Sequence, residues 1–271
     1  MNSLNTKIIT TNYYQQFDAD YELDVPGEGY GGWKKAGLEF SLDRMAVVVM
    51  HAWDGGTLEE FPGWYRSVEH IPRAAEIGQT IFPSLLSSVR KSSVPLFHVV
   101  GGGDYYKEQE GYKRAVELAG PEPENPSRID SDDITSNLRR FKAEHSFVGA
   151  DNQEDVKRGF EAVDFMPSAI PLESEGVAEN AHQLAALCRE SNINHLVYAG
   201  FAINWCLLLS PGGMADMTKH GIMCSAIRQA VTAVENKETA RDEICKEIAL
   251  WRVALAFGFV FDLDDFLAGL G

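Results

Sequence analysis

Cysteine is scarce in this chain, which has four cysteines among 271 residues. None of them belongs to a CxxC pair, so neither a metal cluster nor a disulfide framework is expected. Sparse and widely separated cysteines are typical of proteins in a reducing compartment, and we therefore expect a cytoplasmic protein. The four are Cys188, Cys206, Cys224 and Cys245.

Basic residues are also few, because 24 Lys and Arg stand against 40 Asp and Glu, which gives a formal charge of −16. Binding to phosphate groups needs a positive surface, so the sequence argues against a nucleic-acid partner and against an anionic membrane surface. No apolar run approaches the length of a membrane span, and the first residues lack the pattern of a signal peptide. We expect an acidic, soluble protein.

Short apolar runs alternate with segments of helical periodicity over most of the chain. The run MAVVVM at 45–50 is continuous and rich in valine, as in buried parallel strands. This alternation predicts an α/β fold with a mostly parallel sheet covered by helices on both faces, and such sheets bind ligands at the carboxyl ends of their strands. The expected strands are 45–50, 94–100, 195–200, 222–227 and 257–261, and the expected helices are 71–91, 177–190, 206–219 and 238–255.

Two segments fall outside this alternation. Residues 1–44 are rich in Gly, Tyr and Asp without a sustained period, so we expect an N-terminal arm that lies over the domain or over a neighbouring subunit. Residues 104–160 are polar, charged and interrupted by prolines, and we expect an insertion that is either a lid or a subunit contact. The chain from 45 to 271 is then one α/β domain that carries this insertion.

The segment HLVYAGFAINWC at 195–206 is the most informative motif. An apolar strand ends at Gly200, and Cys206 opens an apolar segment that is expected to be helical. A cysteine at the start of a helix faces free backbone N–H groups and the positive end of the helix dipole, which favour a thiolate nucleophile. The alternative is a buried structural cysteine. Because Pro211 lies inside the expected helix, that helix is expected to be short or broken.

The segment from 200 to 231 resembles the signature of the isochorismatase-like cysteine hydrolases, with Gly200, Cys206 and Gly221 at the matching positions. The resemblance runs from about residue 45 to the end of the chain. It implies a three-layer α/β/α fold, a cysteine nucleophile and a homo-oligomer. It also implies hydrolysis of small C–N-bonded substrates such as amides, although the family includes vinyl-ether hydrolases without the cysteine.

The chain departs from this family at the other members of the catalytic triad. The family's aspartate at the end of the first strand corresponds to His51, and its lysine has no counterpart in 164–180. The threonine three residues before the cysteine is Ile203. Three hypotheses follow from these differences.

In the first hypothesis, the protein is a cysteine hydrolase in which Cys206 is the nucleophile and His51 is the general base. Asp54 or Asp104 orients the imidazole, and backbone N–H groups around Ala202–Cys206 form the oxyanion hole. The expected substrate-binding residues are Trp53 and Trp205, which stack on a planar substrate, Gly102, which allows close backbone approach, and Asp104 and Ala202.

In the second hypothesis, the catalytic set is lost and the fold serves as a binding or assembly protein. In the third, a divalent metal binds to His51 and Asp54, with His98 and Asp104 nearby, because imidazole and carboxylate suit zinc or iron. Family nicotinamidases bind a metal close to the cysteine through such residues. We expect a small-molecule substrate and no cofactor.

Overall fold

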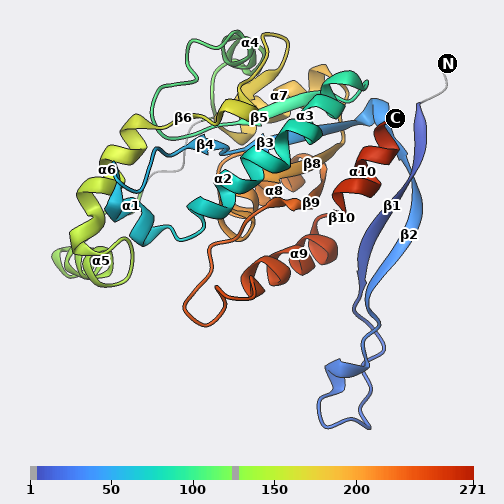
Figure 1. Ribbon diagram of the computed structural model, residues 1–271, viewed down its shortest axis with the longest axis horizontal. Helices are drawn as coiled ribbons and strands as arrows, with labels where there is room; N and C mark the ends of the chain where they lie inside the picture. Colours follow the sequence, from blue (N-terminus) through green and yellow to red (C-terminus); the bar gives the residue numbers. More distant parts are fainter. Residues whose placement is uncertain (1–4, 124–127) are drawn as a thin grey trace.

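The computed structural model describes residues 5–123 and 128–271, which form a central sheet with helices on both sides (Figure 1). The strands are β1 (Thr6–Gln15), β2 (Gly32–Ser41), β3 (Met45–Met50), β4 (Trp53–Asp54), β5 (Leu96–Val99), β6 (Asp164–Phe165), β7 (Gly176–Ala178), β8 (His195–Gly200), β9 (Met223–Val231) and β10 (Val260–Phe261). The helices are α1 (Pro62–Ser67), α2 (Ile71–Thr80), α3 (Phe82–Lys91), α4 (Glu110–Ala119), α5 (Asp133–His145), α6 (Gln153–Ala162), α7 (Ala181–Glu190), α8 (Met214–Met217), α9 (Ile244–Ala256) and α10 (Leu263–Leu270).

The sheet has eight strands in the order β2-β1-β10-β9-β8-β3-β5-β7. The pairs from β10 to β7 are all parallel, and β1 pairs in antiparallel fashion with both β2 and β10. A separate two-stranded sheet joins β4 to β6. The mostly parallel sheet predicted from the sequence is confirmed, and β3 and β8 have the predicted bounds.

Two apolar cores lie on opposite faces of the sheet, because successive residues of a strand point to opposite sides. Along β3, Val48 packs into one core with helices α7, α8 and α9, and Val47 packs into the other with α2, α3 and α10. Both valines are fully buried. These two cores establish the three-layer α/β/α arrangement.

Several predicted elements differ from the observed ones. The helix expected over 71–91 is divided into α2 and α3, and Pro83 lies in the first turn of α3, where its missing N–H costs nothing. The helix expected from residue 206 is instead a π-helix, Ile203–Leu207, followed by the turn that contains Pro211 and by the short helix α8. Cys206 therefore lies inside a helical turn and does not open a helix, so the prediction that its thiol faces the positive end of a helix dipole is wrong.

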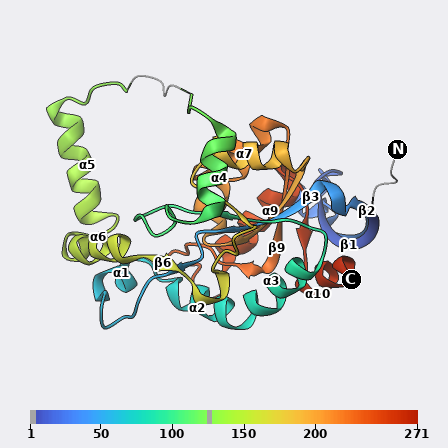
Figure 2. The ribbon, with the colours of Figure 1, turned by 90° about the horizontal axis from the view of Figure 1, so that it is seen from above.

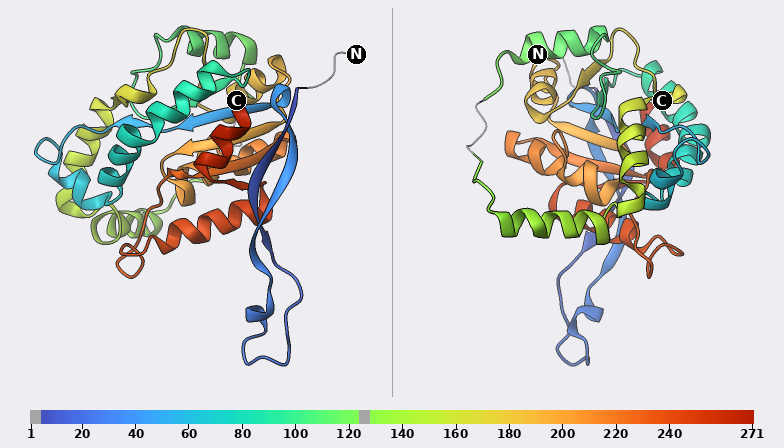
Figure 3. Two further views of the ribbon diagram at one scale, coloured as in Figure 1. Left: turned by 45° about the vertical axis from the view of Figure 1, so that its right-hand side comes forward. Right: turned by 90° about the vertical axis from the view of Figure 1, so that its left-hand side faces the viewer.

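The first 44 residues contribute two long strands, although no period was recognised in them. Strands β1 and β2 pair along their whole length, from Thr6 with Ser41 to Gln15 with Gly32, and β1 joins the sheet at Val260. The end of this hairpin projects away from the rest of the molecule (Figures 1 and 3). Among the described residues, no helix is long and apolar enough to cross a membrane.

Candidate functional site

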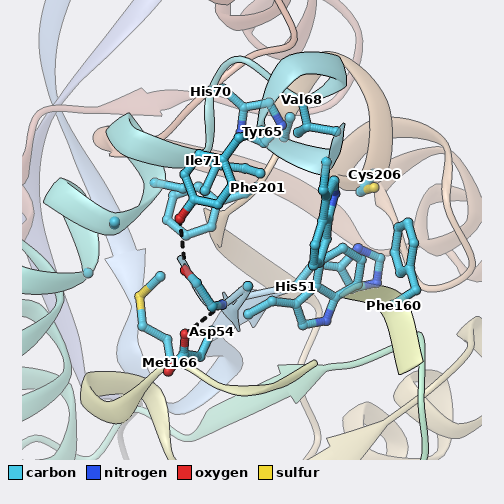
Figure 4. A pocket seen from close by; sticks show the side chains of 18 of the residues that line it. His51, Asp54, Tyr65, Val68, His70, Ile71, Phe160, Met166, Phe201 and Cys206 are labelled. Carbon is cyan, nitrogen blue, oxygen red and sulfur yellow. Dashed lines mark hydrogen bonds between the residues drawn. The ribbon is translucent and has the colours of Figure 1, made fainter. Parts of the chain in front are cut away.

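A cavity of about 750 Å³ lies at the carboxyl ends of the two central strands, β3 and β8 (Figure 4). Met50 at the end of β3 pairs with Gly200 at the end of β8, so the residues that follow the two strands meet at one edge of the sheet. His51 follows β3 directly, and Cys206 follows β8 by six residues. Both side chains line the cavity, as predicted for residues at this edge.

His51 is almost fully buried and is held in an uncommon backbone conformation, with a φ of 51°. Its N–H donates to the carbonyl of Val99 over 2.9 Å, and its ring stacks on Trp53 with 4.5 Å between centroids. Burial lowers the pKa of His51 to about 4, against a smaller opposing effect of the Val100 carbonyl. The imidazole is therefore neutral at pH 7, and its Nδ1 atom is buried with no hydrogen-bond partner among the described residues.

Cys206 differs from the two cysteines of the core. Cys188 and Cys224 are buried, and their burial raises the pKa of both thiols well above the ordinary value. Cys206 is partly accessible and contributes to the cavity wall. Cys245 is also partly accessible, but it does not line the cavity and lies beside Thr239. Within the described chain, Cys206 is thus the cysteine that a molecule bound in this cavity can reach.

The backbone around Cys206 has both engaged and available N–H groups. The amides of Trp205 and Leu207 both donate to the Ala202 carbonyl, and the amide of Ile203 donates to the Thr232 carbonyl. The amides of Asn204 and Cys206 make no hydrogen bond to a carbonyl outside the π-helix in the described structure. These two are the candidates for oxyanion donors in the region that the sequence indicated.

The predicted acidic partners are not bonded to His51 in the described structure. Asp54 lines the cavity, and its Oδ1 accepts from the N–H of Gly56 over 3.1 Å (Figure 4). Asp104 is highly exposed, forms an ion pair with Lys107 and does not line the cavity. Gly102 also lies outside the cavity lining, with a φ of 71°. The structure therefore brings Asp54, but neither Asp104 nor Gly102, to the same cavity as Cys206.

The predicted aromatic residues do line this cavity, together with Ala202. The indole N–H of Trp53 donates to the Tyr105 hydroxyl over 2.9 Å, which fixes the ring in place. Trp205 is half exposed, and its ring lies 5.7 Å from that of Phe147. Trp53 thus belongs to the inner wall of the cavity, and Trp205 belongs to its exposed rim.

Much of the cavity wall comes from residues that no sequence pattern predicts as part of a site. His70 is a second cavity histidine, and burial lowers its pKa to about 4 as well. Its Nδ1 lies 3.2 Å from the Thr232 hydroxyl. A histidine before a predicted helix is a weak signal, and aromatic residues in loops give no period. The other unpredicted wall residues include Trp64, Tyr65, Phe147, Phe160, Met166 and Phe201.

The metal hypothesis receives no geometric support at His98. This residue is buried, and its Nε2 lies 2.8 Å from an oxygen of Glu175, away from the cavity. Among the residues that the structure describes, no three His, Cys, Asp or Glu side chains are placed to share a metal ion. Zinc needs three or four such ligands, so His51 and Asp54 alone do not fit a stable site.

Comparison with known proteins identifies the fold. No protein-family model matches the chain, and no curated protein matches it. A solved cysteine hydrolase from Pseudomonas syringae is similar over 85% of this chain and 94% of its own, with 14% identity and a TM-score of 0.51. An isochorismatase-like hydrolase from Alkaliphilus metalliredigens is similar over 85% and 98% of the two chains, with 15% identity and a TM-score of 0.47.

An isochorismatase family protein from Burkholderia thailandensis is similar over 84% of this chain and 96% of its own, with 14% identity and a TM-score of 0.44. The chain has the three-layer α/β/α fold of the isochorismatase-like cysteine hydrolases, and the predicted fold is confirmed.

Proposed function

We propose that the protein is a cysteine hydrolase that cleaves the C–N bond of a small, uncharged amide with an apolar body. The observation that carries the proposal is that Cys206 and His51 line one cavity at the carboxyl ends of adjacent strands. A reachable thiol and a neutral imidazole are the two groups that this chemistry needs.

The chemistry of the cavity wall favours an uncharged substrate. The lining is mainly aromatic and aliphatic, and no Lys or Arg is among the described residues that form it. Its two histidines are neutral at pH 7, because burial lowers the pKa of His51 and of His70 to about 4. An anionic substrate would therefore lose its hydration without gaining a counter-charge. Pockets with this lining suit aromatic or branched apolar groups.

The proposed reaction has two steps. The Cys206 thiol gives its proton to Nδ1 of His51, and Sγ attacks the amide carbonyl carbon. The amides of Asn204 and Cys206 stabilise the oxyanion. The C–N bond then breaks, the leaving amine takes the proton from the imidazolium, and a thioester on Cys206 remains. Water adds to the thioester carbon, which releases a carboxylic acid and restores the thiol.

The roles of the remaining predicted residues follow from their contacts. In this proposal Asp54 orients the imidazole only if it exchanges its hydrogen bond with Gly56 for one to His51. Trp53 is the rigid wall against which His51 stacks, and it would contact the planar part of a substrate. Trp205 would cover the substrate from the exposed rim.

The test is the pH dependence of Cys206 alkylation by iodoacetamide, followed residue by residue by mass spectrometry. Cys245 is the internal control, because it is partly accessible but outside the cavity. We expect Cys206 to react faster than Cys245 at neutral pH. His51→Ala should slow Cys206 by about tenfold or more and leave Cys245 unchanged.

His70→Ala is the matched control variant, because His70 is also a buried cavity histidine with a lowered pKa of about 4. If both variants slow Cys206 equally, the effect is one of cavity structure and His51 is not the base. If Cys206 reacts no faster than Cys245 at neutral pH, the nucleophile assignment is wrong.

A non-catalytic binding protein is the second candidate. It is favoured by the stacking of His51 on Trp53 and by the buried Nδ1 of His51, which has no hydrogen-bond partner, Cys206 included, among the described residues. An inert Cys206 thiol, together with displacement of an apolar fluorescent probe from the cavity by small aromatic amides that are not hydrolysed, would establish this function instead. Turnover of any such amide that is lost in Cys206→Ala would exclude it.

A further inference from the structure

The end of the β1–β2 hairpin, residues 16–31, is an acidic and apolar projection that we call the hairpin tip. It contains five carboxylates, at 18, 20, 22, 24 and 28, and no Lys or Arg. Its large side chains face solvent, with Tyr21 87% exposed and Phe17 and Val25 each 56% exposed. Figures 1 and 3 show the tip standing clear of the body of the molecule. Exposed aromatic residues on such a projection indicate a binding partner.

Helix α5 is a second element with an unpaired apolar face. Ile134, Leu138 and Phe141 follow one another at helical spacing and are 71%, 64% and 60% exposed. We call these three residues the α5 stripe. Figure 2 shows α5 held away from the central sheet, on the opposite side of the molecule from the hairpin. A stripe with this spacing normally packs against another element.

The charges next to the α5 stripe are opposite in sign to those of the hairpin tip. Arg139, Arg140 and Lys142 lie within four residues, and none of them forms an ion pair with a carboxylate in the described part of the chain. The carboxylates of the tip also have no basic partner there. Arg139 and Arg140 donate hydrogen bonds only to the neutral side chains of Ser131 and Asn137, so their charges are not compensated by a carboxylate within the described chain.

We propose that the hairpin tip of one copy of this chain docks on the α5 stripe of a second copy. Docking places Phe17, Tyr21 and Val25 on the stripe and brings the tip carboxylates to the basic cluster. The tip and α5 of a single copy lie at opposite sides of the molecule, so the contact joins two copies head to tail. Such an interface closes into a ring or continues as a chain.

The docked tip would also lie at the rim of the cavity. The N–H of Phe147 donates to the carbonyl of Lys142 at the end of α5, and the Phe147 ring lies beside Trp205. Both aromatic rings line the cavity and are about half exposed. A second copy would therefore cover an opening that one copy leaves to solvent. The inference does not depend on the proposed hydrolase activity.

Sedimentation velocity of the full chain at micromolar concentration, with two charge-reversal variants, tests this inference. The first variant is Glu22→Lys with Asp24→Lys and Glu28→Lys, which leaves two carboxylates against three lysines in the tip. The second is Arg139→Glu with Lys142→Glu, in α5. We expect the unaltered chain to sediment as an assembly and each variant alone to sediment as a monomer. An equimolar mixture of the two variants should assemble again, because the reversed tip of one fits the reversed α5 of the other.

The matched control is Lys91→Glu with Lys237→Glu, which changes the net charge as the α5 variant does, at exposed sites outside both surfaces. It should assemble as the unaltered chain does. The inference is overturned if the unaltered chain is monomeric, if either reversal alone leaves assembly intact, if the control also dissociates, or if the mixture stays monomeric. Recovery in the mixture also excludes misfolding as the cause of dissociation.

Discussion

Glu175 is the residue whose removal we expect to destabilise the protein most clearly. Its buried carboxylate accepts hydrogen bonds from Nε and a terminal nitrogen of Arg90 over 2.7 and 3.0 Å. It also accepts from Nε2 of His98 over 2.8 Å and from the N–H of Leu172 over 3.0 Å. Burial alone would raise the pKa of Glu175, but these hydrogen bonds outweigh burial and lower the pKa to about 2.

The expected magnitude follows from what Glu175→Ala leaves behind. His98 loses its acceptor in the interior, and an unsatisfied buried group costs about 1–3 kcal/mol. Arg90 loses its carboxylate, and breaking a buried ion pair costs about 3–5 kcal/mol in total. We therefore expect the free energy of unfolding to fall by about 3–5 kcal/mol. Glu175→Gln keeps an acceptor oxygen and should cost about half as much.

Urea unfolding at pH 7, followed by tryptophan fluorescence, measures this loss. Glu173→Ala is the control, because Glu173 is an exposed carboxylate two residues away. A loss of less than about 1 kcal/mol for Glu175→Ala would refute the reasoning, since that is the range of an ordinary surface substitution. The contribution of Glu175 should be present above pH 4.5 and disappear as the pH falls through about 2, because its pKa is lower in the folded state.

Two further predictions concern the edge of the sheet that carries the cavity. Burial lowers the pKa of His51 and of His70 to about 4 in the folded protein, whereas both have the ordinary pKa of 6.5 in the unfolded chain. As the pH falls below 6.5, the unfolded chain therefore binds more protons than the folded protein, and this lowers the free energy of unfolding. Each histidine should therefore remove roughly 2 kcal/mol of unfolding free energy between pH 7 and pH 5, and replacing His70 by Asn should make that pH dependence shallower in denaturant titrations. Gly200→Ala should cost several kcal/mol, at least ~2, because its new Cβ would lie 2.0 Å from the carbonyl oxygen of Met50 at a φ of 124°. Gly221→Ala meets no atom within 4 Å and should cost only about 1–2 kcal/mol, so equal melting temperatures for the two variants would contradict this account.

The strands were predictable from the sequence because buried parallel strands are continuous apolar runs. The runs at 45–50 and 195–200 gave β3 and β8 with their observed bounds. Parallel pairing of these two strands then placed His51 and Cys206 at the same edge of the sheet. This part of the site depends on topology, which local sequence patterns determine well.

The first strands escaped prediction for a physical reason. Strand β1 is exposed or half-exposed at most positions, and it carries threonines, tyrosines and an asparagine rather than a clean alternation of apolar and polar residues. Its partner β2 is an edge strand with two lysines. Edge strands commonly carry such charges, and their pattern is weak because one side faces water. Pairing in space, rather than periodicity, defines this hairpin.

The spacing of residues in the sequence does not predict which hydrogen-bond or ion-pair partner a titratable side chain has in the fold. His98 and Asp104 follow or end a strand in the sequence and therefore looked like neighbours of His51. In the structure, the His98 ring points to Glu175, 77 positions along the chain, and Asp104 faces solvent with Lys107. Side-chain direction at the end of a strand depends on the pleat, which a short run such as 96–99 does not fix from sequence alone.

Some residues of the cavity directly follow strands of the sheet, and others come from helices and loops. Sequence patterns predict the positions of the first group but not of the second, so the sequence suggests a type of reaction and no particular substrate. His51 and Cys206 sit directly after strands, where the register of β3 and β8 fixes their positions. The walls that would contact a substrate, such as Trp64 and Phe160, come from α1 and from α6 of the insertion. Those segments have no strand pattern and pack through aromatic contacts between residues far apart in the chain. In the proposed reaction, substrate choice would therefore depend on the tertiary packing of α1 and α6, whereas the placement of His51 and Cys206 depends on the strands of the sheet.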